Sequence, residues 1–322
     1  MPAVRRPIQG SRGFYPRVRA KKTYPRIKSW GISNEAKPLG FAGFKAGMTH
    51  ATVIDSNSNS KTKGQSIVRA VTILDCPPLS VFGFNVYSKT PYGFKTTGTV
   101  LSDKLDKNLS RKFGAKKIKT EEQMKKIDGN NVSYIRLLVH TKPGFKKTPE
   151  VFELGVGGSS EKQLEYAKGM LGKELKASEI LKAGDYVDVF ANSKGKGFQG
   201  PVKRFGIRIL GRKFQQMHRH VGALGTTEPG KIRSTVPAAG QLGWQSRMDY
   251  NKKVLQILDG KKVVMSGGFL RYGNLSGEAV VIDGSVVGTT KRLVKLRFAI
   301  RGPTSRYPAD LKSLSLTSKQ GV

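Results

Sequence analysis

Two stretches of this chain are strongly basic and show no hydrophobic period of the kind that builds helices or strands. Residues 1–30 hold nine Lys or Arg, no acid and four prolines. Residues 193–253 hold thirteen Lys or Arg, two acids and frequent glycines. Proline and glycine at this density break regular structure. We therefore expect both stretches to extend from a smaller globular body and to be ordered by an acidic partner. A solubilising tail is the alternative for the first stretch.

The overall charge narrows the class of that partner. The 322 residues include 58 Lys and Arg against 22 Asp and Glu, a formal net charge of +36. A positive electrostatic field of this size indicates a polyanionic partner, either nucleic acid or an anionic membrane surface. The chain has no apolar run long enough to cross a bilayer, and its first residues lack the apolar core of a secretory signal. A single cysteine, Cys76, and four histidines exclude a disulfide framework, disfavour a structural zinc site and fit a reducing cytosol.

The remaining chain is typical of a β-rich body. Apolar and β-branched residues predict strands over 66–74, 134–139, 184–190 (a turn and then a strand), 278–282 and 293–300. The runs 254–258 and 261–265 flank Asp259 and Gly260, a pattern that predicts a hairpin. A helix is expected over 161–175, with a short one inside 103–128. Lys295, Arg297 and Arg301 are expected on one face of the last strand. Strands before and after the second basic stretch favour a β-barrel or sheet that this stretch interrupts.

One motif resembles a cofactor site. Residues 195–200 match the glycine fingerprint of dinucleotide-binding folds and directly follow a predicted strand. The acid that would bind the ribose about 20 residues later is missing, because none occurs before Glu228. Glycines beside Lys194, Lys196, Lys203 and Arg204 more simply let backbone amides approach phosphates. A nucleotide-dependent RNA-modifying enzyme that uses this loop remains the alternative.

Histidines and carboxylates indicate no other chemistry. His218 and His220 lie close in sequence, yet no Cys, Asp or Glu lies near enough to complete a metal site, so contact with RNA or packing is the better interpretation. No nucleophile elbow and no carboxylate pair stands out. Cys76 is expected to be a small buried residue. A peripheral membrane protein would need an amphipathic basic helix, whereas Pro and Gly break the basic segments here.

Several ordered blocks resemble the ribosomal protein L3 (uL3) family in its archaeal form. The blocks are NSKGKGFQGPVKRFG at 192–206, HVG at 220–222, TEPGKI at 227–232, AGQLGW at 239–244, GGFLRYG at 267–273, GSVVG at 284–288 and KRLVKLR at 291–297. Weaker likeness at 39–49 and 184–190 extends the resemblance over most of the chain.

The resemblance implies a mainly β fold with an α/β insertion, in which a translation-factor-like β-barrel carries a long basic N-terminal arm and a long basic internal loop. The expected segments are an N-terminal extension at 1–38, barrel parts at 39–79, 181–193 and 254–300, the α/β insertion at 80–180, the internal extension at 194–253 and a C-terminal tail at 301–322. It also implies that the internal extension reaches toward the peptidyl transferase centre and that the protein acts early in large-subunit assembly.

We therefore expect a structural RNA-binding protein of the cytoplasmic ribosome, without enzymatic activity, cofactor or metal. Its expected partners are large-subunit ribosomal RNA and neighbouring ribosomal proteins of the L14 and L24e families, with no membrane and no small-molecule substrate. Lys and Arg would neutralise phosphates. The residues expected to bind RNA are Arg5, Arg6, Arg12, Arg17, Arg19, Lys21, Lys22, Arg26, Lys194, Lys196, Lys203, Arg204, Arg208, Arg212, Lys213, His218, Arg219, His220, Lys231, Arg233, Gln241, Trp244 and Arg247. Among them, Gln241 and Trp244 are expected near the tip of the internal extension, where they would hydrogen-bond and stack.

Overall fold

The computed structural model describes residues 10–114, 119–127, 132–228, 230–303, 307 and 310–318. The chain divides into two compact units. We call Met1–Thr23 with Asn192–Arg247 the extension unit, and Tyr24–Ala191 with Met248–Val322 the body unit. The described residues 10–23 are called the N-terminal arm. Both predicted basic stretches thus contribute to one unit, although about 170 residues separate them in the sequence.

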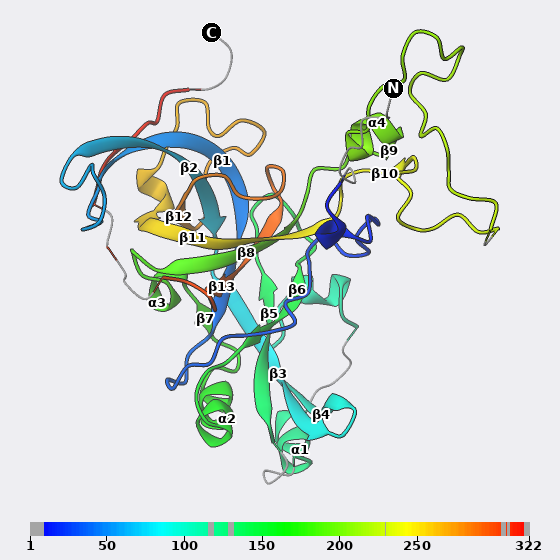
Figure 1. Cartoon of the computed structure of the whole chain (residues 1–322). Coiled ribbons are helices and arrows are strands. Elements are labelled where there is room, and N and C mark those ends of the chain that lie inside the picture. The colour runs from blue at the N-terminus through cyan, green and yellow to red at the C-terminus, as the bar shows by residue number, and fades with distance from the viewer. Residues whose placement is uncertain are drawn as a thin grey trace. The chain divides into compact units, whose positions relative to one another are not determined.

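Long strands of the body unit form a ring of hydrogen-bonded neighbours (Figure 1). These strands are β1 (Gly40–Ile54), β2 (Ser66–Cys76), β8 (Tyr186–Asn192), β11 (Ser246–Asp259), β12 (Glu278–Asp283) and β13 (Leu293–Phe298), and β14 (Asp310–Leu314) adds to β1 at one edge. The order β13-β8-β11-β12-β2-β1 closes because β1 also pairs with β13 in antiparallel register from Gly40 opposite Arg297. A closed ring leaves no free sheet edge within it.

A second sheet is inserted between β2 and β8. It consists of β3 (Leu79–Thr90), β4 (Gly93–Leu101), β5 (Tyr134–Thr141), β6 (Val151–Gly155) and β7 (Glu174–Leu175), in the order β4-β3-β5-β6 with β7 paired to β3. The short helices are α1 (Thr120–Lys125), α2 (Ser160–Gly169) and α3 (Ala177–Ile180), and a 3-10 turn spans Lys107–Arg111. Helix α2 packs on β5, where the Gln163 side chain accepts a hydrogen bond from the backbone N–H of Ile135 at 2.8 Å.

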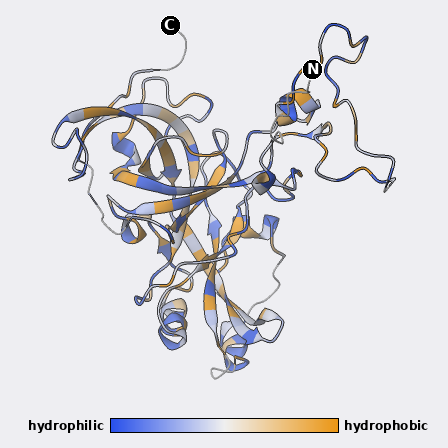
Figure 2. Ribbon diagram, viewed as in Figure 1, coloured by the Kyte–Doolittle hydropathy of each residue, from blue (hydrophilic) through white to orange (hydrophobic). Residues whose placement is uncertain are grey.

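One hydrophobic core serves both sheets of the body unit. Phe41 and Leu74 from the ring and Phe84 and Leu137 from the inserted sheet are fully buried in the same cluster. Figure 2 shows the apolar residues following these strands, with hydrophilic residues in the connecting turns. Burial of each such side chain stabilises the fold by about 1.5–3 kcal/mol. The fold is therefore mainly β with an α/β insertion, and Cys76 is buried within it as expected.

Most predicted strands are confirmed, as is the short helix in 103–128, but the helix predicted over 161–175 ends earlier. Helix α2 stops at Gly169, and Gly172 then adopts a left-handed φ of +75°. The chain turns there so that Glu174 and Leu175 can pair with β3. Hydrogen bonding of residues 174 and 175 to β3 therefore stabilises the chain more than continuing the helix that the local sequence pattern predicts.

The hairpin predicted around Asp259 and Gly260 is wrong. Strand β11 pairs with β12, and the Asp259 side chain instead caps a 3-10 turn over Gly260–Lys262. The following loop is held by Asp75, whose buried carboxylate accepts hydrogen bonds from the Tyr272 hydroxyl at 2.6 Å and from the backbone N–H of Gly277 at 2.8 Å. A carboxylate distant in sequence therefore overrides the local turn signal.

The cations predicted on one face of the last strand do not form a basic surface. Lys295 and Arg297 share a face, but they are only 3% and 4% exposed. The Lys295 ammonium lies 4.4 Å from the ring centre of Tyr24, and Arg297 forms an ion pair with Asp188. Arg301 is exposed but lies beyond the end of β13, so its predicted place on that face is wrong.

Candidate nucleic-acid interface

The extension unit presents most of its cations to solvent. Its exposed Lys and Arg residues are Arg12, Arg19, Lys21, Lys22, Lys194, Lys196, Lys203, Arg208, Arg212, Lys213, Arg219, Lys231 and Arg233. Glu228 is the only acid in this unit's sequence. None of these cations forms an ion pair with a residue that the structure describes. Within the described part of the chain, no acidic residue neutralises their charge through an ion pair.

The two ends of the internal loop are hydrogen-bonded to each other. Strand β9 (Phe198–Gln199) pairs with β10 (Gly240–Gln241), and the backbone N–H of Lys196 donates to the carbonyl of Leu242 at 3.0 Å. Gly243 has a φ of +77°, and a Cβ there would lie 1.9 Å from the carbonyl oxygen of Lys194, so this crossing requires glycine. Between β10 and the end of α4, the described residues 206–228 and 230–239 contain no helix or strand.

The N-terminal arm packs on these joined ends. The backbone N–H of Ala20 donates to the carbonyl of Trp244 at 2.8 Å, and the indole Nε1 of Trp244 donates to the carbonyl of Ala20 at 3.0 Å. The Asn192 side chain donates to the carbonyl of Lys22 at 2.7 Å. Reciprocal bonds of this kind fix the register of a segment that has no period of its own.

A short helix, α4 (Pro201–Phe205), anchors the arm. Pro201 occupies the first turn and Gly206 ends the helix with a left-handed φ of +70°. Phe205 is buried, and the Arg17 guanidinium lies 4.5 Å from the ring centres of both Phe205 and Tyr15. This cation–aromatic stack gives the extension unit a small core.

Arg204 is engaged within the protein. Its Nε donates to the carbonyl of Gln241 at 3.0 Å, its Nη1 to that of Ala238 at 2.9 Å and its Nη2 to that of Arg17 at 3.1 Å. Burial, and then repulsion from Arg17, lowers the pKa of Arg204 from its ordinary value. Its planar fork of donors joins the arm, the loop and α4, whereas the neighbouring Lys203 is exposed.

Gln241 and Trp244 do not lie near a loop tip, so that prediction is wrong. Gln241 belongs to β10, and Trp244 is half-buried against the arm at the joined ends of the loop. Arg247 is also half-buried, with its guanidinium 4.7 Å from the ring centre of Phe14. Burial, and then repulsion from another arginine, lowers its pKa.

Other predicted RNA-binding residues are distributed as follows. Arg5 and Arg6 lie outside the described residues, and Arg26 belongs to the body unit. His218 is half-buried, with its Nδ1 3.2 Å from the carbonyl of Gly211, and His220 is exposed. Across the described ranges no group of three or more metal-ligating side chains gathers.

The glycine fingerprint lacks the surroundings of a dinucleotide site. Strand β8 pairs antiparallel with β13, whereas that site requires a parallel strand–helix–strand unit. Helix α4 is five residues long and begins after Gly200. So short a helix gives neither the dipole nor the row of N–H groups that holds a pyrophosphate. The enzyme alternative therefore loses its structural basis.

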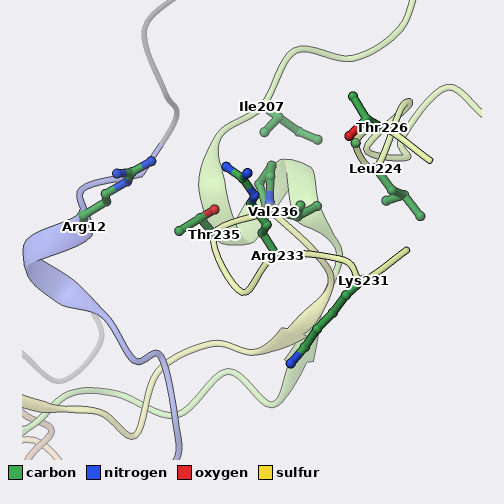
Figure 3. A pocket seen from close by; sticks show the side chains of 10 residues that line it. Arg12, Ile207, Leu224, Thr226, Lys231, Arg233, Thr235 and Val236 are labelled. Carbon is green, nitrogen blue, oxygen red and sulfur yellow. The ribbon is translucent and has the colours of Figure 1, made fainter. Parts of the chain in front are cut away.

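A cavity of about 510 Å³ lies within the extension unit (Figure 3). Its cationic lining combines Arg12 from the arm with Lys231 and Arg233 from the loop, and Figure 3 shows these side chains coming from separate segments. Ile207 and Leu224 supply apolar wall. Cations beside apolar surface suit the phosphate and the base of an unpaired nucleotide.

Sequence reasoning missed the exposed apolar side chains of this loop. They are Phe198, Ile209, Phe214, Met217, Leu224 and Ile232. The sequence pattern that could have predicted them is the mixing of apolar residues with cations in a segment that has no helical or strand periodicity. Exposed apolar side chains beside charged ones often mark a contact surface. The arm's contacts with the loop were also missed, because its partners are 170 or more residues away in the sequence.

The comparisons with known proteins cover the whole chain. The family model of ribosomal protein L3 matches residues 1–321. Similar proteins, each named large ribosomal subunit protein uL3, occur in the archaea Methanothermobacter thermautotrophicus (45% identical, 98% of both chains), Methanosphaera stadtmanae (44%, 98% of both) and Methanothrix harundinacea (42%, 100% of both). No helix among the described residues is long and apolar enough to cross a bilayer. With identities of this size over nearly all of its length and an extension unit rich in unpaired cations, the chain belongs to the ribosomal protein L3 family.

Proposed function

We propose that this chain is a structural constituent of the large ribosomal subunit in the cytoplasm, and that its extension unit binds large-subunit ribosomal RNA. The observation that carries the proposal is the set of exposed cations in that unit. The unit's sequence contains a single acid, and these cations have no ion-pair partner among the described residues. The family is one of ribosomal proteins and not of enzymes, which agrees with this assignment.

The mechanism is electrostatic and geometric. Each phosphate that a Lys or Arg neutralises releases a condensed counterion, which favours binding and lets RNA helices approach one another. The internal packing around Arg204 and Phe205 holds the backbone so that neighbouring side chains such as Lys203 remain free for phosphate. Contacts of this kind set position and shape rather than sequence preference.

The finer features implied by family membership are part of the same proposal. The closed ring of strands would be a barrel of the translation-factor type, and the internal loop would reach toward the peptidyl transferase centre. Binding early in assembly would order RNA helices around the chain. Proteins of the L14 and L24e families would be its neighbours.

Salt dependence of binding to large-subunit ribosomal RNA tests this proposal. Lys194→Ala with Lys196→Ala removes two exposed charges from the extension unit, while Lys61→Ala with Lys63→Ala removes two exposed charges from a loop of the body unit. Each lost phosphate contact lowers the slope of log affinity against log salt by about 0.7–0.9, so the first pair should lower it by about 1.4–1.8. The second pair should leave it unchanged. Equal effects of the two pairs would show that the extension unit is not the principal RNA-binding surface.

A further inference from the structure

The body unit has a cavity of its own, of about 500 Å³. Four separate segments line it, namely residues 26–29, strand β8, the start of β11, and the end of β13 with the residues that follow it. This volume lies within the range of about 300–1,000 Å³ that is typical of sites for small ligands.

A buried ion pair forms part of its lining. Asp188 is fully buried and pairs with Arg297, which is 4% exposed. Asp188 also accepts a hydrogen bond from the backbone N–H of Asn251 at 3.1 Å. Arg297 Nη1 donates to the carbonyl and the hydroxyl of Ser29 at 2.8 and 2.9 Å. The Arg297 Nε has no acceptor among the described residues, although an unsatisfied buried donor is costly.

Unpaired cations surround this pair. Arg26, Lys28 and Arg301 are exposed, and their side chains make no hydrogen bond or ion pair with any residue in the described ranges. The only carboxylate of the lining, Asp188, is already paired with Arg297. The cavity thus has surplus positive charge and selects an anion.

The remaining lining is aromatic and apolar. Phe190 is 8% exposed, whereas Tyr250 is 52% exposed and Ile300 is 48% exposed. Large side chains half open to solvent beside a cavity offer a stacking surface for a planar ring. Met248 adds a polarisable thioether to the same lining.

Asn251 holds the aromatic wall in place. It has a left-handed φ of +54°, which a non-glycine residue adopts rarely and keeps only when its surroundings hold it. Its side chain donates to the carbonyl of Arg301 at 3.1 Å, and its backbone N–H donates to Asp188. The backbone beside Tyr250 is thus hydrogen-bonded to that of Arg301 through the Asn251 side chain before any ligand binds.

We propose that this cavity binds one unpaired nucleotide of RNA, with the base against Tyr250 and its phosphate among Arg26, Lys28 and Arg301. The inference rests on the proposed function, because it assumes that RNA reaches the chain. A base inside a duplex cannot enter a cavity, so single-stranded RNA is the ligand class. An acidic peptide would use the cations, but it would leave the stacking wall without a planar partner.

Crosslinking on the full chain tests the proposal. Single-stranded octamers of 4-thiouridine are irradiated with the protein, and crosslinked peptides are mapped by mass spectrometry. We expect crosslinks in the peptide that contains Tyr250 in addition to those in the extension unit. Tyr250→Ala should weaken binding at this site about 5- to 150-fold, and Tyr250→Phe should restore it because the ring is kept. Tyr92→Ala, at a fully exposed tyrosine elsewhere in the body unit, is the matched control and should change nothing.

Each other outcome has a distinct meaning. Crosslinks confined to the extension unit would overturn this site and leave the proposed function standing. Crosslinks near Tyr250 that persist in Tyr250→Ala would also overturn it. If hexaglutamate removed these crosslinks at lower concentration than unlabelled octauridine, the cavity would belong to an acidic protein partner instead. Absence of any crosslink would contradict RNA binding as a whole.

Discussion

Replacing Arg204 and Lys203 one at a time distinguishes a cation that holds the protein together from a cation that is free to bind phosphate. Arg204 donates to three backbone carbonyls, while the adjacent Lys203 is exposed and has no ion-pair partner among the described residues. We expect Arg204→Ala to loosen the extension unit and Lys203→Ala to leave it folded. Lys203→Ala should instead lower the salt slope of RNA binding by about 0.7–0.9.

The size of the structural effect follows from the lost contacts. A hydrogen bond to a charged group contributes about 1.5–3 kcal/mol when buried and less where water can replace it. Arg204 is only partly buried, so its three bonds together with its contact to the Phe205 ring at 5.1 Å should contribute about 2–4 kcal/mol. That loss raises the local opening equilibrium about 30- to 900-fold.

Amide hydrogen exchange on the free protein measures this effect. Peptides that cover 236–242 should lose protection in Arg204→Ala while the strands of the body unit keep theirs. Arg204→Lys should behave like the alanine variant, since it keeps the charge but loses the planar fork. If Arg204→Lys retained full protection, or if Lys203→Ala lost as much as Arg204→Ala, charge alone and not the three carbonyl contacts would account for the role of Arg204.

Three further outcomes are expected. Asp75→Asn should lower the free energy of unfolding by about 2–4 kcal/mol in urea titrations, because the buried loop donors lose their charged acceptor; a change below about 0.5 kcal/mol would contradict the network. Burial acts to raise the pKa of Glu153, but hydrogen bonds from Tyr87 and Arg136 outweigh it and the pKa is lowered. The carboxylate therefore stabilises the fold above its unfolded pKa and loses this effect as pH falls through the folded value, so Glu153→Gln should flatten the acid side of the stability profile, and an unaltered profile would refute this. Trp244→Ala should expose the N-terminal arm to hydrogen exchange, and unchanged protection would show that the indole bond does not hold it.

Much of the architecture could be predicted from the sequence. Strands such as 66–74 and 134–139 are confirmed because β-branched residues in short bounded runs act locally. The two basic stretches could also be predicted, because they combine many cations with no hydrophobic periodicity. Neither stretch can bury enough apolar surface to form a core. The ordered blocks between residues 192 and 297 are enough to indicate the ribosomal protein L3 family.

The role of each cation was decided by the tertiary structure. In sequence Lys203 and Arg204 are equivalent, and so are Arg297 and Arg301, yet one of each pair is internal and the other exposed. The internal ones are distinguished by partners that lie far along the chain, such as the carbonyl of Arg17 and the carboxylate of Asp188. A side chain binds phosphate only if folding leaves its donors free. That condition depends on contacts between residues distant in sequence, which local patterns of charge and hydrophobicity do not encode.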